Sequence, residues 1–193
     1  MINGNFWNHH RKLTSSWYEA TTVIEPLDHF ISEVNNKAYT HHIPRLMILS
    51  NFANLLDINP RELTTWFHEA FIDAYDWVVE PNVLAMGTYA VGDIMTTKPY
   101  VSGTPYIKKM GDYCGDCSLH FKKSCPISDL YWNFLEENKG HFSGNHRMAM
   151  PMRMLAKRTD EAKKTANDVT NYVRKRMAKG LILEPSILEE IKS

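Results

Sequence analysis

The stretch Tyr39-Thr-His41-His42-Ile-Pro44-Arg45 opens the run of residues around which we expect the rest of the chain to pack. Neighbouring side chains on a helix point about 100° apart, so two adjacent histidines can line two walls of one pocket. Pro44 suits the first turn of a helix, because its fixed φ is helical and its missing N–H needs no partner there. The stretch therefore predicts a helix start that carries a histidine pair. Histidines of this kind are also found as ordinary core or surface residues.

Arg45 begins a stripe on the following helix, which is expected over residues 43–56 and is nearly apolar all round. A charged residue on an apolar stripe needs a partner. The next helix is expected to open at Pro60 and to end at Pro81, and its apolar side carries Asp73. The sequence therefore predicts an Arg45–Asp73 ion pair between two buried helix faces.

Length and composition indicate one domain, spanning residues 1–193, with no general preference for polyanions. A chain of 193 residues suits a single domain, and its formal net charge is zero. No stretch approaches the ~18 apolar residues of a membrane span, and the first residues lack the apolar run of a signal peptide. Three cysteines favour thiols or a metal in a reducing cytosol over a disulfide framework. We expect an all-α cytoplasmic protein with no membrane segment.

Further helices follow from apolar spacing at residues 27–38, 127–137 and 159–179, and Thr159 and Gly180 suit the two ends of the last one. The basic residues on the outer face of that helix, Arg174 among them, read as a solvated face, or alternatively as phosphate contacts.

Three segments have a weaker pattern. Residues 1–26 are expected to be irregular, and residues 148–155 to form a short helix interrupted at Pro151. Residues 81–112 lose the helical period, and about thirty irregular residues inside a domain are either functional or a surface loop with aromatic anchors.

The motif Cys114-Gly-Asp-Cys117, followed by Cys125, is a candidate metal site. Two thiolates two residues apart can clamp one metal, and a third thiolate further on can close the loop. Three cysteines suit an iron–sulfur cluster or a zinc that lacks a fourth ligand, which His120 could supply for zinc. Free buried thiols are the alternative.

The run Ala38-Tyr-Thr-His-His-Ile-Pro-Arg-Leu-Met-Ile-Leu-Ser-Asn-Phe-Ala53 resembles the photolyase/cryptochrome superfamily, and more narrowly its bacterial iron–sulfur (6-4) photolyase branch, the deoxyribodipyrimidine photolyase-related proteins. Similar runs include Phe71-Ile-Asp-Ala-Tyr-Asp-Trp77 and Thr97-Lys-Pro-Tyr100, and the resemblance covers about residues 5–155. It implies the C-terminal part of the helical FAD-binding domain, with a long irregular loop region. It also implies that the N-terminal antenna domain and the first half of the FAD domain are absent from this chain.

The resemblance implies roles for five residues of one pocket. His41 and His42 match the histidine pair that faces the DNA lesion, one of them as proton donor, which suits imidazole near neutral pH. Arg45 and Asp73 match a pair beside the isoalloxazine ring of FAD, and Asn82 lies where a side chain would face flavin N5.

The resemblance also implies lesion-pocket and electron-transfer positions. Met86 and Tyr100 match residues of the lesion pocket. Trp66 and Tyr18 match the chain that reduces the flavin, although tryptophan is expected at the second position, where Trp17 adjoins it.

Cys114, Cys117 and Cys125 match three ligands of the family's iron–sulfur cluster, but the fourth position falls on Pro26, which cannot bind a metal. The implied function is light-driven repair of UV-damaged DNA, either the (6-4) photoproduct or a related pyrimidine dimer, with the damaged nucleotide flipped into the pocket. A second chain carrying the N-terminal half is the expected partner. The alternatives are a cryptochrome-like light-sensing or flavin-binding module and a non-catalytic remnant.

Overall fold

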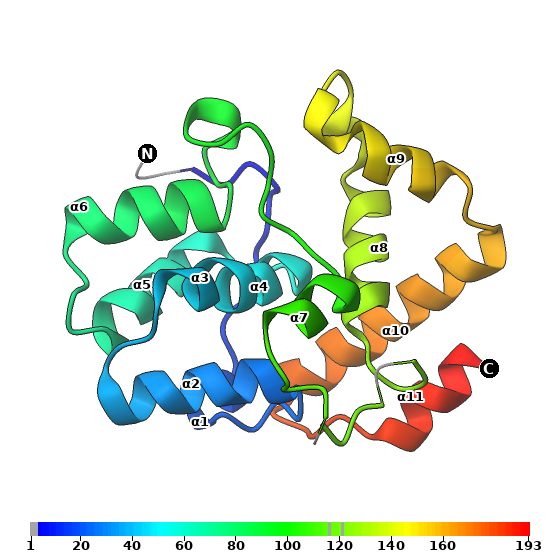
Figure 1. The fold of residues 1–193 in the computed structure, drawn as a ribbon, viewed down its shortest axis with the longest axis horizontal. Helices are drawn as coiled ribbons and strands as arrows, with labels where there is room; N and C mark the ends of the chain where they lie inside the picture. Colours follow the sequence, from blue (N-terminus) through cyan, green and yellow to red (C-terminus); the bar gives the residue numbers. More distant parts are fainter. Residues whose placement is uncertain (1–3, 116, 121) are drawn as a thin grey trace.

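The computed structural model describes residues 4–115, 117–120 and 122–193 (Figure 1). These residues form helices and connecting segments without a β-strand, which confirms the all-α expectation. None of the helices in these ranges has the length and apolar character needed to cross a membrane. The α-helices are α1 (Ser15–Glu19), α2 (Glu25–Lys37), α3 (His42–Pro44), α4 (Asn51–Leu55), α5 (Pro60–Ala70), α6 (Asp76–Val79), α7 (Thr104–Met110), α8 (Ile127–Glu137), α9 (Ala149–Ala156), α10 (Asp160–Ala178) and α11 (Pro185–Lys192). The other helical segments are the π-helices η1 (Arg45–Ser50) and η2 (Glu80–Gly87) and the 3-10 turns η3 (Gly92–Ile94), η4 (Lys139–Phe142) and η5 (His146–Met148).

The helices form two groups that the segment before α1 joins. Helices α2 to α6 make one group, and α10 packs along α8 in the other, with α9 and α11 beside them (Figure 1). The Trp7 Nε1 atom donates to the carbonyl oxygen of Thr88 at 3.0 Å, and the backbone N–H of Arg11 donates to the carbonyl oxygen of Asp57 at 3.0 Å. Trp7 is buried, and its ring centroid lies 5.1 Å from that of Phe134 on α8, so the N-terminal segment contacts both groups.

Helix ends follow the expected chemistry. The Asn59 side chain accepts a hydrogen bond from the backbone N–H of Arg61 at 2.8 Å at the start of α5. The Thr159 hydroxyl accepts one from the backbone N–H of Ala162 at 3.2 Å at the start of α10. Gly180 stops that helix with φ +64°, a left-handed conformation that glycine adopts without steric cost.

The central helix runs without a break from His42 to Leu55 and changes from α to π geometry over η1. A second π-helix, η2, packs against it. The contact is close at Gly87, where an added Cβ would lie 2.5 Å from the Ser50 Oγ atom, so only glycine fits. Because π-helical segments are rare and frequently occur at functional sites, the contact between η1 and η2 is a candidate functional region.

The prediction of a single helix from Pro60 to Pro81 is wrong. Helix α5 ends at Ala70, and Phe71 is extended, with φ −107° and ψ 134°. A new helix begins at Asp76, and Pro81 lies inside it, at the change from α6 to η2 where its missing N–H is tolerated. The apolar spacing misled because it continues across a turn as far as Trp77, whose side chain is 74% exposed.

Three smaller expectations also need correction. Residues 81–112 are not irregular throughout, because they contain most of η2, together with η3 and α7. The short helix α9 is not interrupted at Pro151, which lies in its first turn. The first 26 residues contain the short helix α1 and the start of α2.

Candidate functional site

A cavity of about 170 Å³ lies where η1 and η2 meet the end of α5. Four residues that the sequence analysis placed in one site line it: His42, Arg45, Asp73 and Asn82. They come from three separate parts of the chain, and the two π-helices bring them together.

The predicted Arg45–Asp73 pair is present. The Arg45 Nη1 and Nη2 atoms each donate to one carboxylate oxygen of Asp73 at 3.0 Å, a bidentate arrangement that fixes both side chains. The Arg45 Nε atom donates to the carbonyl oxygen of Thr40 at 2.8 Å, and its guanidinium carbon lies 4.4 Å from the Phe71 ring centroid and 4.9 Å from that of Tyr39. A fixed cation beside two aromatic rings therefore forms one wall of the cavity.

The surroundings of this pair differ from the expectation of two buried helix faces. Asp73 lies in the turn after α5 and its side chain is 41% exposed, whereas that of Arg45 is 14% exposed. The pair therefore spans from a half-buried wall to the surface, where a ligand can reach it.

The two histidines differ in role. His42 is exposed and lines the cavity, so it stands at its mouth. His41 precedes the helix as its N-cap, with its Nδ1 atom accepting from the backbone N–H of Ile43 at 3.4 Å, and it does not line the cavity. The two imidazoles are therefore not two walls of one pocket.

Asn82 lies on η2, and its Nδ2 atom donates to the carbonyl oxygen of Val78 at 2.8 Å. Met86 is half-buried further along η2, and Tyr100 is half-buried in the segment before α7. Neither of these two residues lines the cavity. Their assignment to a lesion pocket stays a prediction.

A row of aromatic rings leads from the surface to the cavity. Tyr18 is 47% exposed, and the neighbouring Trp17 is buried with its ring centroid 6.0 Å from that of Trp66. The Trp66 ring lies 5.7 Å from the Phe71 ring, and Phe71 stacks on Phe67 at 4.5 Å. Phe67 and Phe71 both line the cavity, so ring contacts are continuous from Trp17 to its wall. These two phenylalanines are not among the site residues predicted from the sequence, although their position in the chain next to Trp66 is a usable signal.

The cysteines do not assemble the expected metal site. Cys114 and Cys117 are half-buried and Cys125 is buried, with its Sγ atom 3.6 Å from the Thr104 hydroxyl. Within residues 4–115, 117–120 and 122–193 no three His, Cys, Asp or Glu side chains are placed to hold a metal, and Asp116 lies outside these ranges. Pro26 at the fourth position is buried and offers no ligand atom. These residues do not fit a four-ligand cluster.

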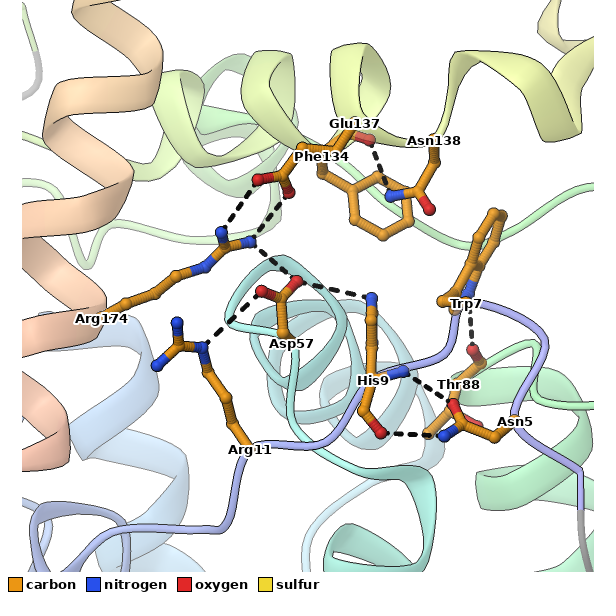
Figure 2. A network of polar contacts seen from close by, with 10 residues as sticks. All are labelled: Asn5, Trp7, His9, Arg11, Asp57, Thr88, Phe134, Glu137, Asn138 and Arg174. Carbon is orange, nitrogen blue, oxygen red and sulfur yellow. Dashed lines mark hydrogen bonds and ion pairs between the residues drawn. The ribbon is translucent and has the colours of Figure 1, made fainter.

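A second polar cluster, which the sequence analysis missed, joins the N-terminal segment to α8 and α10 (Figure 2). Arg174 is 6% exposed and donates to both carboxylate oxygens of Glu137 at 3.0 Å, while its Nη2 atom lies 2.7 Å from Asp57. Arg11 and His9 approach Asp57 at 3.7 and 3.5 Å. The interpretation of Arg174 as part of a solvated basic face is therefore wrong.

Burial sets the direction of the pKa shifts of His9 and Asp57 in this cluster. It lowers the pKa of His9 to about 4, with help from the positive charge of Arg174. Burial also raises the pKa of Asp57 to about 6, against the lowering effect of Arg174 and Arg11. Burial alone would raise the pKa of Glu137, but the hydrogen bonds and charge of Arg174 bring it below its usual value. At neutral pH, His9 is therefore a neutral neighbour of Asp57.

These shifts predict an unusual pH dependence of stability. The stability from His9 is present above pH 6.5 and is lost as the pH falls toward about 4, whereas the stability from Asp57 is lost as the pH rises through about 6. Each shift corresponds to about 3 kcal/mol of the free energy of unfolding, and the two effects oppose each other between pH 6.5 and 4.

Replacing His9 with glutamine should remove the His9 effect and leave the Asp57 effect. On acidification, the free energy of unfolding of this variant should therefore rise by up to about 3 kcal/mol relative to that of the wild type.

Urea unfolding at several pH values measures this difference. His10→Gln is the matched control, because His10 is the exposed neighbour of His9 and bonds to Asn8. Its stability curve should run parallel to that of the wild type. A His9→Gln curve that is also parallel would show that His9 does not titrate as described.

No family model matches the chain. A (6-4) photolyase of Agrobacterium fabrum is 36% identical over 167 residues, which cover 84% of this chain and 33% of the photolyase. An uncharacterised protein of Acanthamoeba polyphaga mimivirus is 33% identical over 125 residues, which cover 65% of this chain and 98% of the viral protein.

The chain belongs to one family with that viral protein. Its similarity to the Agrobacterium enzyme supports a place among the photolyases, and it spans about a third of the length of that relative. The all-α fold agrees with the helical domain that the resemblance implied. The iron–sulfur branch and the correspondence to the C-terminal part of the domain remain predictions.

Proposed function

We propose that this chain supplies the flavin-facing and lesion-facing part of a photolyase-type enzyme that repairs UV-damaged DNA in the light. The observation that carries the proposal is the single cavity lined by His42, Arg45, Asp73 and Asn82. The similarity to a (6-4) photolyase supports the same reaction class, and the (6-4) photoproduct or a related pyrimidine dimer is the proposed substrate.

The cavity fits one edge of a flat, polar ring. Arg45 and Asp73 offer a fixed donor and acceptor pair, and Asn82 keeps its Oδ1 atom for a ligand N–H because its Nδ2 atom bonds to Val78. The volume of the cavity, 170 Å³, is below the ~300–1,000 Å³ of ordinary ligand pockets. The rest of FAD therefore needs other contacts. We propose that this chain is one helical unit of the FAD-binding domain, that it holds the flavin ring and supports repair by itself when FAD is in excess, and that a second chain adds the contacts to the rest of FAD.

Bound FAD would supply the light-driven electron that such a repair requires. His42 at the cavity mouth is the proposed proton donor to the lesion, a role that suits an exposed imidazole. Trp17 and Trp66, with Tyr18 at the surface, are the proposed route by which electrons reach the ring, because their contacts lead to the cavity wall. His41, the N-cap of α3, is proposed to hold the start of that helix in place.

Damaged DNA is the proposed partner. Tyr75 and Trp77, which follow Asp73 in the chain, stack at 4.8 Å with an interplanar angle of 5° and are 56% and 74% exposed. Exposed aromatic faces of this kind stack on nucleic-acid bases, and a flipped nucleotide would enter next to them.

Illumination of the purified chain with FAD and an oligonucleotide that carries one (6-4) photoproduct tests the proposal. The lesion should disappear in blue light and persist in the dark. Flavin binding without repair would favour the light-sensing module, and neither binding nor repair would favour the non-catalytic remnant.

A further inference from the structure

A second cleft lies on another part of the molecule, between the N-terminal segment and the end of α10. Its volume of about 520 Å³ falls in the ~300–1,000 Å³ range of small-molecule sites. It shares no lining residue with the cavity of His42 and Arg45. The proposed repair reaction does not use it as a binding site.

The floor of this cleft is apolar apart from one donor. Trp17, Leu56, Ile58 and Met177 line it and are almost fully buried. The Trp17 Nε1 atom is buried without a hydrogen-bond partner in the described part of the chain, and Trp17 itself is 1% exposed. Because a buried N–H without an acceptor is unfavourable, this indole favours a ligand that brings an acceptor.

The charged residues that line the cleft are all cations: Arg11, Lys12, Arg174 and Lys179. Figure 2 shows that the two arginines are already engaged, Arg174 by Glu137 and Asp57 and Arg11 by Asp57. Lys12 and Lys179 have no acidic partner within the ranges that the structure describes, and both are exposed. The cleft therefore carries positive charge that the protein does not neutralise.

We propose that this cleft binds a small organic anion with an apolar body, such as an aryl or acyl carboxylate. The body lies on the floor, the acceptor takes the hydrogen bond of Trp17, and the charge lies near Lys12 and Lys179. A hydrogen bond to a charged acceptor is among the stronger ones in proteins, and an anion is the acceptor that the lysines also attract.

Two fluorescent probes of nearly the same shape test the proposal on the native chain. Anilinonaphthalene sulfonate carries the negative charge, and phenylnaphthylamine lacks it. The sulfonate should bind at least about tenfold more tightly than the neutral probe. Octanoate should displace it, and inorganic phosphate at the same concentration should not, because phosphate has no apolar body.

Variants locate the binding. Lys179→Glu should weaken sulfonate binding by about tenfold and leave the neutral probe unchanged, while Lys175→Glu, exposed on the same helix outside the cleft, should change neither. Trp17→Phe, which keeps an aromatic ring but removes the donor, should weaken sulfonate binding at least about fivefold. Urea unfolding of each variant verifies that it is folded.

Equal sulfonate binding by the Lys179→Glu and Lys175→Glu variants would overturn the proposal, because the probe would then sit elsewhere. Equal affinity for the charged and neutral probes would overturn it too.

Discussion

Replacing Arg174 with methionine is expected to lower the free energy of unfolding by about 3–5 kcal/mol. The side chain is 6% exposed and lies between two carboxylates, with contacts of 2.7 Å to Asp57 and 3.0 Å to Glu137. Methionine keeps much of the apolar stem but leaves Asp57, which is 22% exposed, with Arg11 at 3.7 Å and the neutral His9 at 3.5 Å. It also leaves Glu137, which is 40% exposed, without its cation. The cost arises mainly from this uncompensated charge.

The control for this prediction lies two residues further along α10. Arg176 pairs with Glu184 at 2.7 Å, but the two side chains are 25% and 48% exposed. Arg176→Met should therefore cost no more than about 1 kcal/mol. Adding Glu137→Gln to Arg174→Met should recover part of the loss, since it removes one of the unpaired acids. Similar decreases in the free energy of unfolding for Arg174→Met and Arg176→Met, measured by urea unfolding, would contradict the prediction that the cluster around Arg174 stabilises the fold more than a surface ion pair does.

Replacing His42 with alanine is expected to reduce the rate of light-dependent (6-4) repair by about 100-fold or more, the usual contribution of a general acid. The imidazole lines the cavity mouth, whereas Arg45, Asp73 and Asn82 form the part proposed to face the flavin. FAD binding should therefore be unchanged in this variant. The repair rate per bound FAD distinguishes the two causes. It falls if the proton donor is lost, and it stays constant if the variant only loses FAD.

His29→Ala controls for the removal of an exposed histidine, because His29 lies on α2 beside Tyr113 and does not line the cavity. Its repair rate should match that of the wild type. Repair that survives His42→Ala at the wild-type rate would refute the assignment of His42 as proton donor.

The sequence predicted contacts in the cavity better than the local structure that makes them. Arg45 and Asp73 were paired by the argument that an arginine on an apolar stripe needs an acid, and the structure joins them at 3.0 Å. The helix assumed to carry Asp73 ends at Ala70, because Phe71 turns away to stack on Phe67. Apolar spacing cannot reveal such a turn when it happens to keep the helical period.

Other features depended on contacts far apart in the sequence. Arg174 looked like part of a basic face because its neighbours are basic, and its burial follows from Asp57 and Glu137, which are distant in the chain. The π-helices η1 and η2 pack closely at Gly87, and helical periodicity encodes neither this contact nor the π geometry. Helix ends were easier to predict because caps such as Thr159 act within one turn.

Binding of FAD to the purified chain tests the central claim most directly, with flavin fluorescence followed during a titration of the wild type, Arg45→Met and Arg61→Met. Arg61 also forms an ion pair between helices, with Glu80 at 3.1 Å, but it does not line the cavity. We predict that the wild type and Arg61→Met bind FAD equally well and that Arg45→Met binds it at least about tenfold more weakly. No binding by the wild type, or the same affinity for all three proteins, would contradict the proposal that this cavity faces a flavin.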